Sequence, residues 1–431
     1  MAVNVPPRQL TGGAGAPAPT HPGPPSRAGR GPVVRHPRYD LHQRPFLVIW
    51  EVTRACDLAC RHCRAEARPD RDPQELTTRE GMRLMEEVAA FGSPPPLFVL
   101  TGGDPFKRED LFDLVRYGSD IGLPVSVSPS GTPLVTAQRL ARLREAGAVA
   151  LSLSVDGSTP EIHDGFRRVP GVFQWTLSAW RAARELGFKV QINTTVTPHN
   201  VEDLPNILAL VRELGAMTWS VFFLVPTGRG RTLGQLSAEE MEDVLHFLYE
   251  ADKVVPLKTT EGHQFRRVVL QRQVLERLGV PPQQVLGLGE TYRRLREGLR
   301  RRLPDVDPDA PSPMRRTPLD VNAGRGFVFI SHVGTVHPSG FLPLAAGNVR
   351  RRSLQDIYRH SPLFVALRAA DRLGGRCGRC EFRFVCGGSR SRAYATLGDP
   401  LAEEPLCPYE PGSFPYQQEL AELLARVASG A

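Results

Sequence analysis

Hydrophobic runs of strand length recur between about residue 45 and residue 255, and stretches with helical periodicity separate them. Four of the helical stretches, at 78–91, 136–146, 175–186 and 201–214, are followed directly by glycine, the usual residue just past a helix end. A regular alternation of strand and helix predicts parallel strands joined by right-handed crossovers. Six strands are expected, at 47–52, 97–101, 124–128, 149–155, 190–196 and 219–224.

Polar and apolar residues alternate along several of these strands, whereas a parallel strand covered on both sides would be almost continuously apolar. Successive side chains of a strand point to opposite sides of the sheet, so each polar set shares one face. A polar inner face predicts an α/β fold, a partial (β/α)6 TIM-like barrel whose lumen holds a polar ligand. An ordinary sheet with hydrogen-bonded Ser and Thr is the alternative. The polar positions are Glu51, Thr53, Ser126, Ser128, Ser152, Ser154, Asp156, Gln191, Asn193 and Thr195.

The rest of the chain divides by composition. Residues 1–40 are rich in Pro, Gly and Arg and cannot bury a core, so we expect a disordered tail. The partial barrel is assigned to 45–255, and 256–318 are expected to form bridging helices and an Arg- and Pro-rich linker. Residues 319–412 hold short strand signals, with a hairpin at Val333-Gly334, and four cysteines, which predicts a small α+β auxiliary domain. An amphipathic helix is expected within 413–431.

The chain is basic, with a formal net charge of +8, and only four of its 54 Lys and Arg residues are lysine. This composition favours a solvated Arg-rich surface, and an Arg-lined site for substrate carboxylates is the alternative. No basic stripe interleaved with aromatic residues indicates nucleic-acid binding. The apolar stretches are too short for a membrane span, and the N-terminus lacks an apolar signal region. We therefore expect a cytoplasmic protein with neither a nucleic-acid nor a membrane partner.

Three of the seven cysteines, Cys56, Cys60 and Cys63, stand on one short segment directly after the first predicted strand. In a reducing compartment, clustered thiols indicate metal ligands rather than disulfides. Iron–sulfur clusters are usually held by four cysteines, so a local triplet predicts a [4Fe–4S] cluster with one iron open to another ligand. A zinc site completed by His62 is an alternative, although residues adjacent in sequence seldom reach one tetrahedral ion together.

A second motif, Gly102-Gly103-Asp104-Pro105, follows the second predicted strand. Together with the cysteine triplet it resembles the radical S-adenosylmethionine (SAM) superfamily. The resemblance implies that the open iron chelates the amino and carboxylate groups of SAM. An electron from the cluster then yields a 5′-deoxyadenosyl radical that abstracts a substrate hydrogen, while the protein supplies binding and position. Gly102 and Gly103 would let the backbone approach the cofactor amine. Asp104, a further cofactor-binding candidate, stands where the family usually has Glu.

The resemblance extends to further cofactor residues. The segment with Ser154 and Asp156 resembles the part of the family that meets the ribose or carboxylate of the cofactor. Arg167 is a candidate partner of the methionine carboxylate, and Asn193 is another inward polar candidate. A purely structural role is the alternative for each of these residues.

A charged segment downstream of the last predicted strand contains Glu261, His263 and Arg266. It follows a predicted helix, at a point where we expect a substrate-facing strand and loop. Its density of ionisable groups would suit an acidic substrate. An exposed charged loop is the alternative.

Four more cysteines lie near the C-terminus: Cys377, Cys380, Cys386 and Cys407. Taken alone, this set suits zinc as readily as an iron–sulfur cluster. Next to the first two motifs it resembles the SPASM auxiliary domain, and the resemblance implies that these residues hold one auxiliary [4Fe–4S] cluster. Full versions hold two, but Asn322, Ser339 and Arg390 stand where further ligands are expected. We therefore predict two clusters in total.

The stretches from Trp50 to Cys56 and from Cys60 to Glu66 resemble enzymes of the alternative heme and heme d1 pathways. This resemblance, which covers about residues 45–412, implies a carboxylate-bearing tetrapyrrole substrate, and an Arg-rich chain suits such a substrate. It also implies an external electron donor such as ferredoxin or flavodoxin. A peptide maturase is the close alternative, and a non-catalytic iron–sulfur electron-transfer protein is the less expected one.

Overall fold

The computed structural model describes residues 40–310 and 321–429. Six parallel strands pair in chain order, each with the next, which confirms the strand positions predicted from the sequence. The predicted disordered tail lies outside the described residues, except for residue 40. The six strands are β1 (Leu47–Glu51), β2 (Leu97–Thr101), β3 (Val125–Val127), β4 (Ala150–Ser154), β5 (Lys189–Val196) and β6 (Thr218–Phe223).

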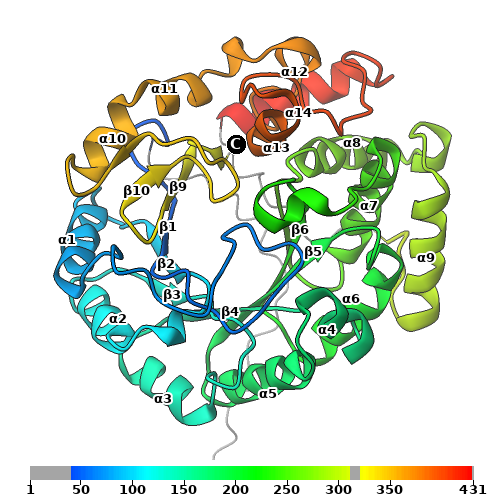
Figure 1. The fold of residues 1–431 in the computed structure, drawn as a ribbon. Coiled ribbons are helices and arrows are strands. Elements are labelled where there is room, and N and C mark those ends of the chain that lie inside the picture. Colours follow the sequence, from blue (N-terminus) through cyan, green and yellow to red (C-terminus); the bar gives the residue numbers. More distant parts are fainter. Residues whose placement is uncertain (1–39, 311–320, 430–431) are drawn as a thin grey trace, which may run out of the picture.

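Helices lie outside these strands and form a ring around them (Figure 1). The first helix begins with a capping box, in which the Thr77 side chain accepts from the Glu80 N–H and the Glu80 carboxylate accepts from the Thr77 N–H. Glycines end four of the helices as predicted, and each has a positive φ, 107° at Gly92 for example. The barrel helices are α1 (Thr78–Ala89), α2 (Leu111–Asp120), α3 (Ala137–Glu145), α4 (Pro160–Arg167), α5 (Val172–Glu185) and α6 (Leu204–Glu213).

Burial confirms the predicted alternation on β4 and β5, whereas all of β3 is buried. On β4, Leu153 is fully buried against the helices, whereas Ser154 on the opposite face is only partly buried. The helix-facing side belongs to one large apolar core that includes the fully buried Trp50, Trp180 and Trp219. The polar face therefore borders the lumen of the barrel, as the pattern of the sequence predicts.

Further strands extend the sheet at both edges. A seventh parallel strand, β7 (Leu257–Thr260), pairs with β6 and lies within the stretch for which bridging helices and a linker were expected. At the other edge, β9 (Gly326–Ile330) pairs parallel with β1, and β10 (Thr335–His337) folds back on β9 through the predicted turn at Gly334. Short strands β8 (Asn322–Ala323) and β11 (Gly347–Asn348) complete this part. The auxiliary segment is thus continuous with the barrel sheet.

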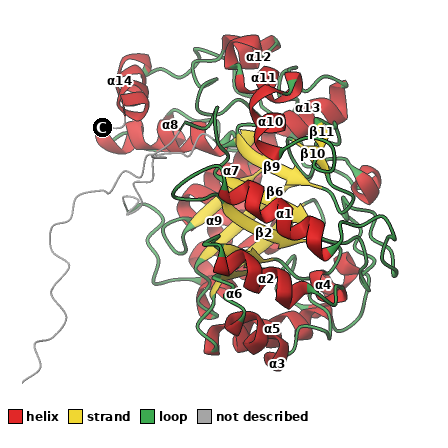
Figure 2. Cartoon of the chain, turned by 90° about the vertical axis from the view of Figure 1, so that its left-hand side faces the viewer, coloured by secondary structure: helices red, strands yellow, loops and turns green. Residues whose placement is uncertain are grey.

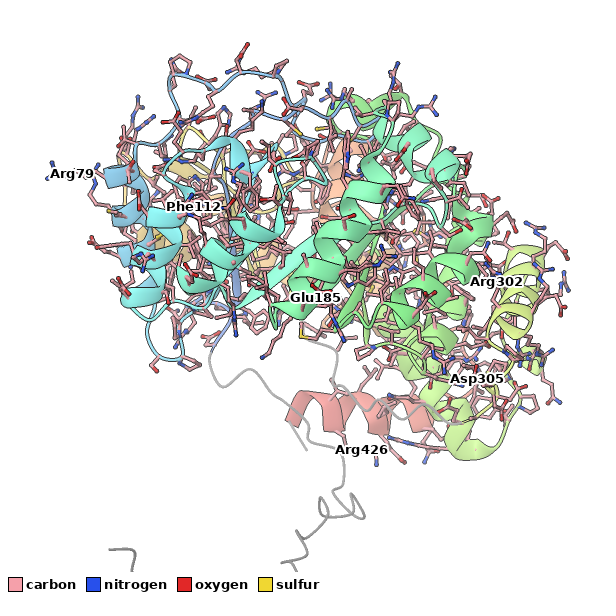
Figure 3. All side chains as sticks on the ribbon, turned by 90° about the horizontal axis from the view of Figure 1, so that it is seen from below. Arg79, Phe112, Glu185, Arg302, Asp305 and Arg426 are labelled. Carbon is pink, nitrogen blue, oxygen red and sulfur yellow. The ribbon has the colours of Figure 1, made fainter. Side chains whose placement is uncertain are left out.

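The helices that follow β11 lie together along one side of the barrel, between α1 and α8 (Figure 1, Figure 2). The predicted terminal helix packs against α8 through a small apolar core that contains Leu270, Phe382 and Leu420. Figure 3 shows it, with Arg426, on the side of the molecule that also carries Asp305. None of the helices described is long and apolar enough to cross a membrane. The α-helices described after α6 are α7 (Ala238–Ala251), α8 (Phe265–Leu278), α9 (Glu290–Arg302), α10 (Leu354–His360), α11 (Pro362–Arg368), α12 (Gly375–Arg379), α13 (Arg390–Leu397) and α14 (Gln417–Ser429).

Candidate active site and auxiliary cysteine site

The first three cysteines lie on one loop at the C-terminal end of β1, the end at which barrel enzymes gather their active sites. Cys56 and Cys60 are buried and Cys63 is partly buried, and all three belong to one apolar cluster with Leu58 and Val172. Burial raises the pKa of Cys56 to about 11 and also raises the pKa of Cys60. Because iron binds the thiolate, loading a cluster here would release protons and offset this burial cost.

Hydrogen-bond donors surround the sulfur atoms of this loop. Arg167 Nη1 lies 3.7 Å from the Sγ of Cys60, and the N–H of Leu58 donates to the Sγ of Cys56 at 3.4 Å. Arg229 Nε donates to the backbone carbonyl of Cys60 at 2.9 Å and so fixes the loop from the other side. Donors and positive charge around cysteine sulfur stabilise a thiolate-ligated cluster, so these residues fit the predicted iron–sulfur group.

His62 does not join the three cysteines. Its ring stacks on Phe166 at 4.4 Å between centroids, and burial together with the charge of Arg167 lowers its pKa to about 3. Within residues 40–310 and 321–429, no three His, Cys, Asp or Glu side chains are arranged to hold a single metal ion. This geometry gives no support to the zinc alternative. A cubane spreads its thiolate ligands farther apart than one ion does, which suits thiols spaced along a loop.

Gly102 and Gly103 pack the second motif directly against the cysteine loop. A Cβ on Gly102 would lie 2.5 Å from the carbonyl oxygen of Thr53, and one on Gly103 would lie 2.3 Å from that of Ala55. The backbone hydrogen bond from Gly103 N to Thr53 O, at 2.8 Å, needs this closeness. Only glycine fits such an approach, and both residues stay partly exposed on their other side, where a cofactor amine could reach their backbone.

Asp104 turns away from this opening. Its carboxylate is fully buried, where it accepts a hydrogen bond from the Thr132 hydroxyl at 2.6 Å and one from the N–H of Phe106 at 3.1 Å. Burial raises the pKa of Asp104. The side chain caps the short helical turn that begins at Pro105 and so helps to hold the backbone next to the glycine pair, while its contact with the cofactor stays a prediction.

The remaining cofactor candidates separate into two groups. Ser154 and Asn193 are register partners on β4 and β5, partly buried, on the lumen face. Asp156 is fully buried and accepts from Arg167 Nε at 2.8 Å and from the Thr195 N–H at 2.7 Å. Burial opposes ionisation of Asp156, but the charge of Arg167, together with His62, His163 and the Thr195 N–H, holds its pKa below the usual value. This ion pair connects strand β4 to the sulfur of a cluster cysteine.

A buried ionic cluster beside the cysteine loop was missed in the sequence. Arg64, the residue after Cys63, donates from Nη1 to Glu51 at 2.8 Å, and its guanidinium lies 4.3 Å above the ring of Phe329 on β9. His332 Nδ1 lies 3.1 Å from the other oxygen of Glu51. Burial would raise the pKa of Glu51, but Arg64 and His332 hold it below its usual value. The polar position of Glu51 on β1 was the only available signal, since its partners lie far apart in the chain.

The four C-terminal cysteines line one cavity, together with Arg267 and Gln264. Burial raises the pKa of Cys380 to about 12 and raises the pKa values of Cys386 and Cys407. Backbone N–H groups point at two of the sulfurs, from Gly388 to Cys386 at 3.4 Å and from Glu404 to Cys377 at 3.3 Å. A shared cavity with four thiols and amide donors fits a thiolate-ligated cluster.

The three positions that lack a cysteine are occupied by hydrogen-bonded side chains. The Asn322 amide donates to the carbonyl of Gly388 at 2.9 Å, and the Ser339 hydroxyl donates to Glu261 at 3.1 Å. The hydroxyls of Ser389 and Ser391 also donate to Glu261. A polar network thus fills the region in which a further cluster would need its ligands.

The structure does not present the charged segment after β7 to an open site. Glu261 is 4% exposed and is fully engaged with serines of the auxiliary segment. His263 is buried, and burial with the nearby positive charges of Arg266, Arg390 and Arg392 holds its pKa well below the usual value. Arg266 donates to the carbonyl of Val385 at 2.9 Å. These side chains connect the barrel to the auxiliary segment, a contact that the local sequence does not reveal.

A partial parallel barrel with a cysteine triplet after β1 and a glycine pair after β2 defines the radical SAM class of enzymes, which use a [4Fe–4S] cluster and SAM. Residues 50–211 match the Radical SAM superfamily, and the chain belongs to it. It is 40% identical to the AdoMet-dependent heme synthase of Oleidesulfovibrio alaskensis, over 86% of this chain and 88% of that protein. It is 39% identical to the AdoMet-dependent heme synthase of Methanosarcina barkeri, over 85% and 97% respectively.

A solved structure shares the fold. SuiB of Streptococcus suis, in a crystal structure with its precursor peptide SuiA, superposes with a TM-score of 0.62. The match covers 85% of this chain and 76% of SuiB at 15% sequence identity. At that identity the similarity extends to the fold alone.

Proposed function

We propose that this chain acts on a carboxylate-bearing tetrapyrrole in the formation of heme. Two heme synthases share 40% and 39% of its residues over most of their length, which supports this substrate class. The observation on the chain itself that carries the proposal is Arg64. It directly follows Cys63, its side chain is 19% exposed, and Glu51 holds its guanidinium above Phe329. A positioned guanidinium next to the radical source suits a substrate carboxylate.

Different residues of the chain would bind the cluster and the cofactor in such a reaction. Cys56, Cys60 and Cys63 would hold the catalytic cluster, and Gly102 and Gly103 give the bound cofactor access to backbone groups. When bound, the cluster and SAM supply the 5′-deoxyadenosyl radical that removes a hydrogen atom from the substrate. The lumen face of β4 and β5 offers polar side chains to the cofactor, and the apolar core behind it keeps water away from the helix side.

We further propose one auxiliary [4Fe–4S] cluster on Cys377, Cys380, Cys386 and Cys407. The shared cavity of these thiols supports it, as does the hydrogen-bonded filling of the neighbouring region. The chain would then hold two clusters and take electrons from a donor such as ferredoxin or flavodoxin. The cytoplasmic location stays a prediction.

The substrate proposal is tested with the anaerobically reconstituted enzyme, SAM, a reductant and iron coproporphyrin III, a tetrapyrrole with carboxylate side chains. We expect 5′-deoxyadenosine to form faster with the porphyrin than without it, and a porphyrin product that has lost carboxyl groups in mass spectra. If the porphyrin changes nothing while a precursor peptide stimulates 5′-deoxyadenosine formation, the substrate proposal is wrong and the peptide alternative holds.

Replacing Arg64 with alanine should weaken substrate binding. A hydrogen bond to a charged group contributes about 1.5–3 kcal/mol, so KM for the porphyrin should rise roughly 10- to 100-fold. Cleavage of SAM without substrate should continue, because the cysteines are unchanged. Arg61, an exposed residue of the same loop, provides the matched control, and Arg61→Ala should leave KM within about twofold. An unchanged KM in Arg64→Ala, with full cluster content, would contradict the role of Arg64.

A further inference from the structure

Arg390 is a buried cation without a carboxylate partner in the described part of the chain. Its side chain is 1% exposed at the start of α13. The guanidinium donates to the backbone carbonyls of Ala402 at 2.6 Å and Pro400 at 3.2 Å. Its Nη2 lies 3.7 Å from the Sγ of Cys377, a cysteine of the auxiliary cavity.

The neighbouring buried cations differ from Arg390 because each has its own carboxylate. Arg392 lies 3.1 Å from both carboxylate oxygens of Glu404. Arg267, which lines the cavity, donates to Glu242 at 2.7 Å and 2.5 Å. Removing a charge from water is costly unless an opposite charge compensates it, and carbonyl dipoles offset only part of that cost. An anion on the side of Cys377 would therefore complete the environment of Arg390.

A cluster bound through four thiolates supplies that anion. It carries net negative charge, and one of its ligand sulfurs already lies within reach of the Arg390 guanidinium. The position also stands out in the sequence pattern, since Arg390 occupies the place where a ligand of a second auxiliary cluster is expected. Arg390 thus stands at a position where a cysteine ligand is expected, and its guanidinium lies next to the remaining auxiliary cluster.

We propose that Arg390 compensates the charge of the auxiliary cluster and raises its reduction potential. The inference rests on the auxiliary cluster of the proposed function. A buried positive charge and a hydrogen bond to a ligand sulfur stabilise the added electron more than the oxidised state, because the reduced cluster is more negative. Arg390 is a positioning residue, since it acts on the cluster through Cys377.

The test uses the full chain with Cys56, Cys60 and Cys63 replaced by alanine, so that the auxiliary cluster is observed alone. Iron and sulfide are measured first, and the cluster is then titrated by electron paramagnetic resonance against redox mediators. Arg390→Gln should keep its iron but show about a tenfold lower ratio of reduced to oxidised cluster at a fixed potential. That factor corresponds to about 59 mV for a one-electron couple. Arg390→Lys, which keeps the charge, should lose less than about threefold.

Arg383 provides the matched control. It lines the same cavity and lies near the carbonyl of Cys380, but it is partly exposed and has Asp371 at 3.6 Å. Arg383→Gln should change the ratio less than about threefold, because solvent and the carboxylate screen its charge. A full-iron Arg390→Gln variant with an unchanged ratio would overturn the inference. If the parent protein for this test holds no iron, the auxiliary-cluster proposal fails instead.

If Arg390→Gln loses its iron, the Arg390→Lys variant still tests the inference. If Arg390→Lys then retains the cluster, the positive charge is needed to hold it, which supports charge compensation. If Arg390→Lys also loses the cluster, the shape of the arginine rather than its charge is required, and the inference is wrong.

Discussion

Replacing Cys56, Cys60 and Cys63 together with alanine should reduce 5′-deoxyadenosine formation to background while about half of the bound iron remains. The three thiols sit on one loop beside the glycine pair, so their loss removes the cluster that binds the cofactor. The C-terminal thiols line a separate cavity in the auxiliary segment and should keep about four irons. Iron and sulfide analysis and product chromatography measure the two effects on the same sample.

The unsubstituted chain and a Cys386→Ala variant are the controls for this experiment. The unsubstituted chain should hold about eight irons and eight sulfides, because two [4Fe–4S] clusters are expected. Cys386→Ala should reduce the amount of iron bound at the auxiliary site and leave the cluster on the first cysteine loop in place. Persistent cleavage in the triple variant would show that the catalytic cluster lies elsewhere. About twelve irons in the unsubstituted chain would contradict the two-cluster proposal.

The barrel was predictable because its signals are local. The side chains of a strand alternate between its two faces, so the two-residue period of polar positions is enough to place Ser154 and Asn193 in the lumen. Glycine after each helix marks a backbone conformation that other residues adopt poorly, as the positive φ of Gly92 shows. The cysteine triplet is local as well, because all of its ligands lie on one loop.

The features that the sequence did not predict depend on contacts between segments that are far apart in the chain. Strand β9 joins β1 across more than 270 residues, and the only sequence signal for it was a short apolar run. Strand β7 reads Leu-Lys-Thr-Thr; a strand and loop were expected near it, but its polar residues did not mark it as a seventh strand of the barrel sheet. Glu261 follows β7 directly, and its serine partners come from the far end of the chain. No local pattern could distinguish it from an exposed charged residue.

The arginine-rich composition also has a partly structural explanation. Arg108 is 1% exposed and donates to the carbonyls of Val52 at 3.1 Å and Leu76 at 2.9 Å, while it pairs with Asp110. Some arginines therefore hold loops together inside the protein, in addition to the arginines expected on the solvated surface. Arg64 differs because it is partly exposed beside the radical source. The number of arginines therefore says little about the substrate, whereas the position of this one does.

Replacing Asp156 with alanine should lower the free energy of unfolding by about 3–5 kcal/mol, since it leaves Arg167 unpaired in a largely buried site. The lowered pKa of Asp156 means that the stabilisation is complete above about pH 4, its ordinary value, and is lost as pH falls through the lower folded-state pKa. Urea unfolding at neutral pH measures the effect. The exposed pair of Arg212 and Asp305 is the control, and Asp305→Ala should cost less than about 1 kcal/mol.

A double variant separates the structural role of this pair from a role toward the cofactor. Asp156→Ala combined with Arg167→Met removes both charges and should recover at least about 2 kcal/mol of the loss, since no buried charge is left unpaired. We expect the double variant to regain stability without regaining SAM affinity, because Arg167 also donates to the sulfur of Cys60. Equilibrium dialysis of the reconstituted protein with SAM measures this. Recovery of both properties would show that Arg167 serves the fold alone.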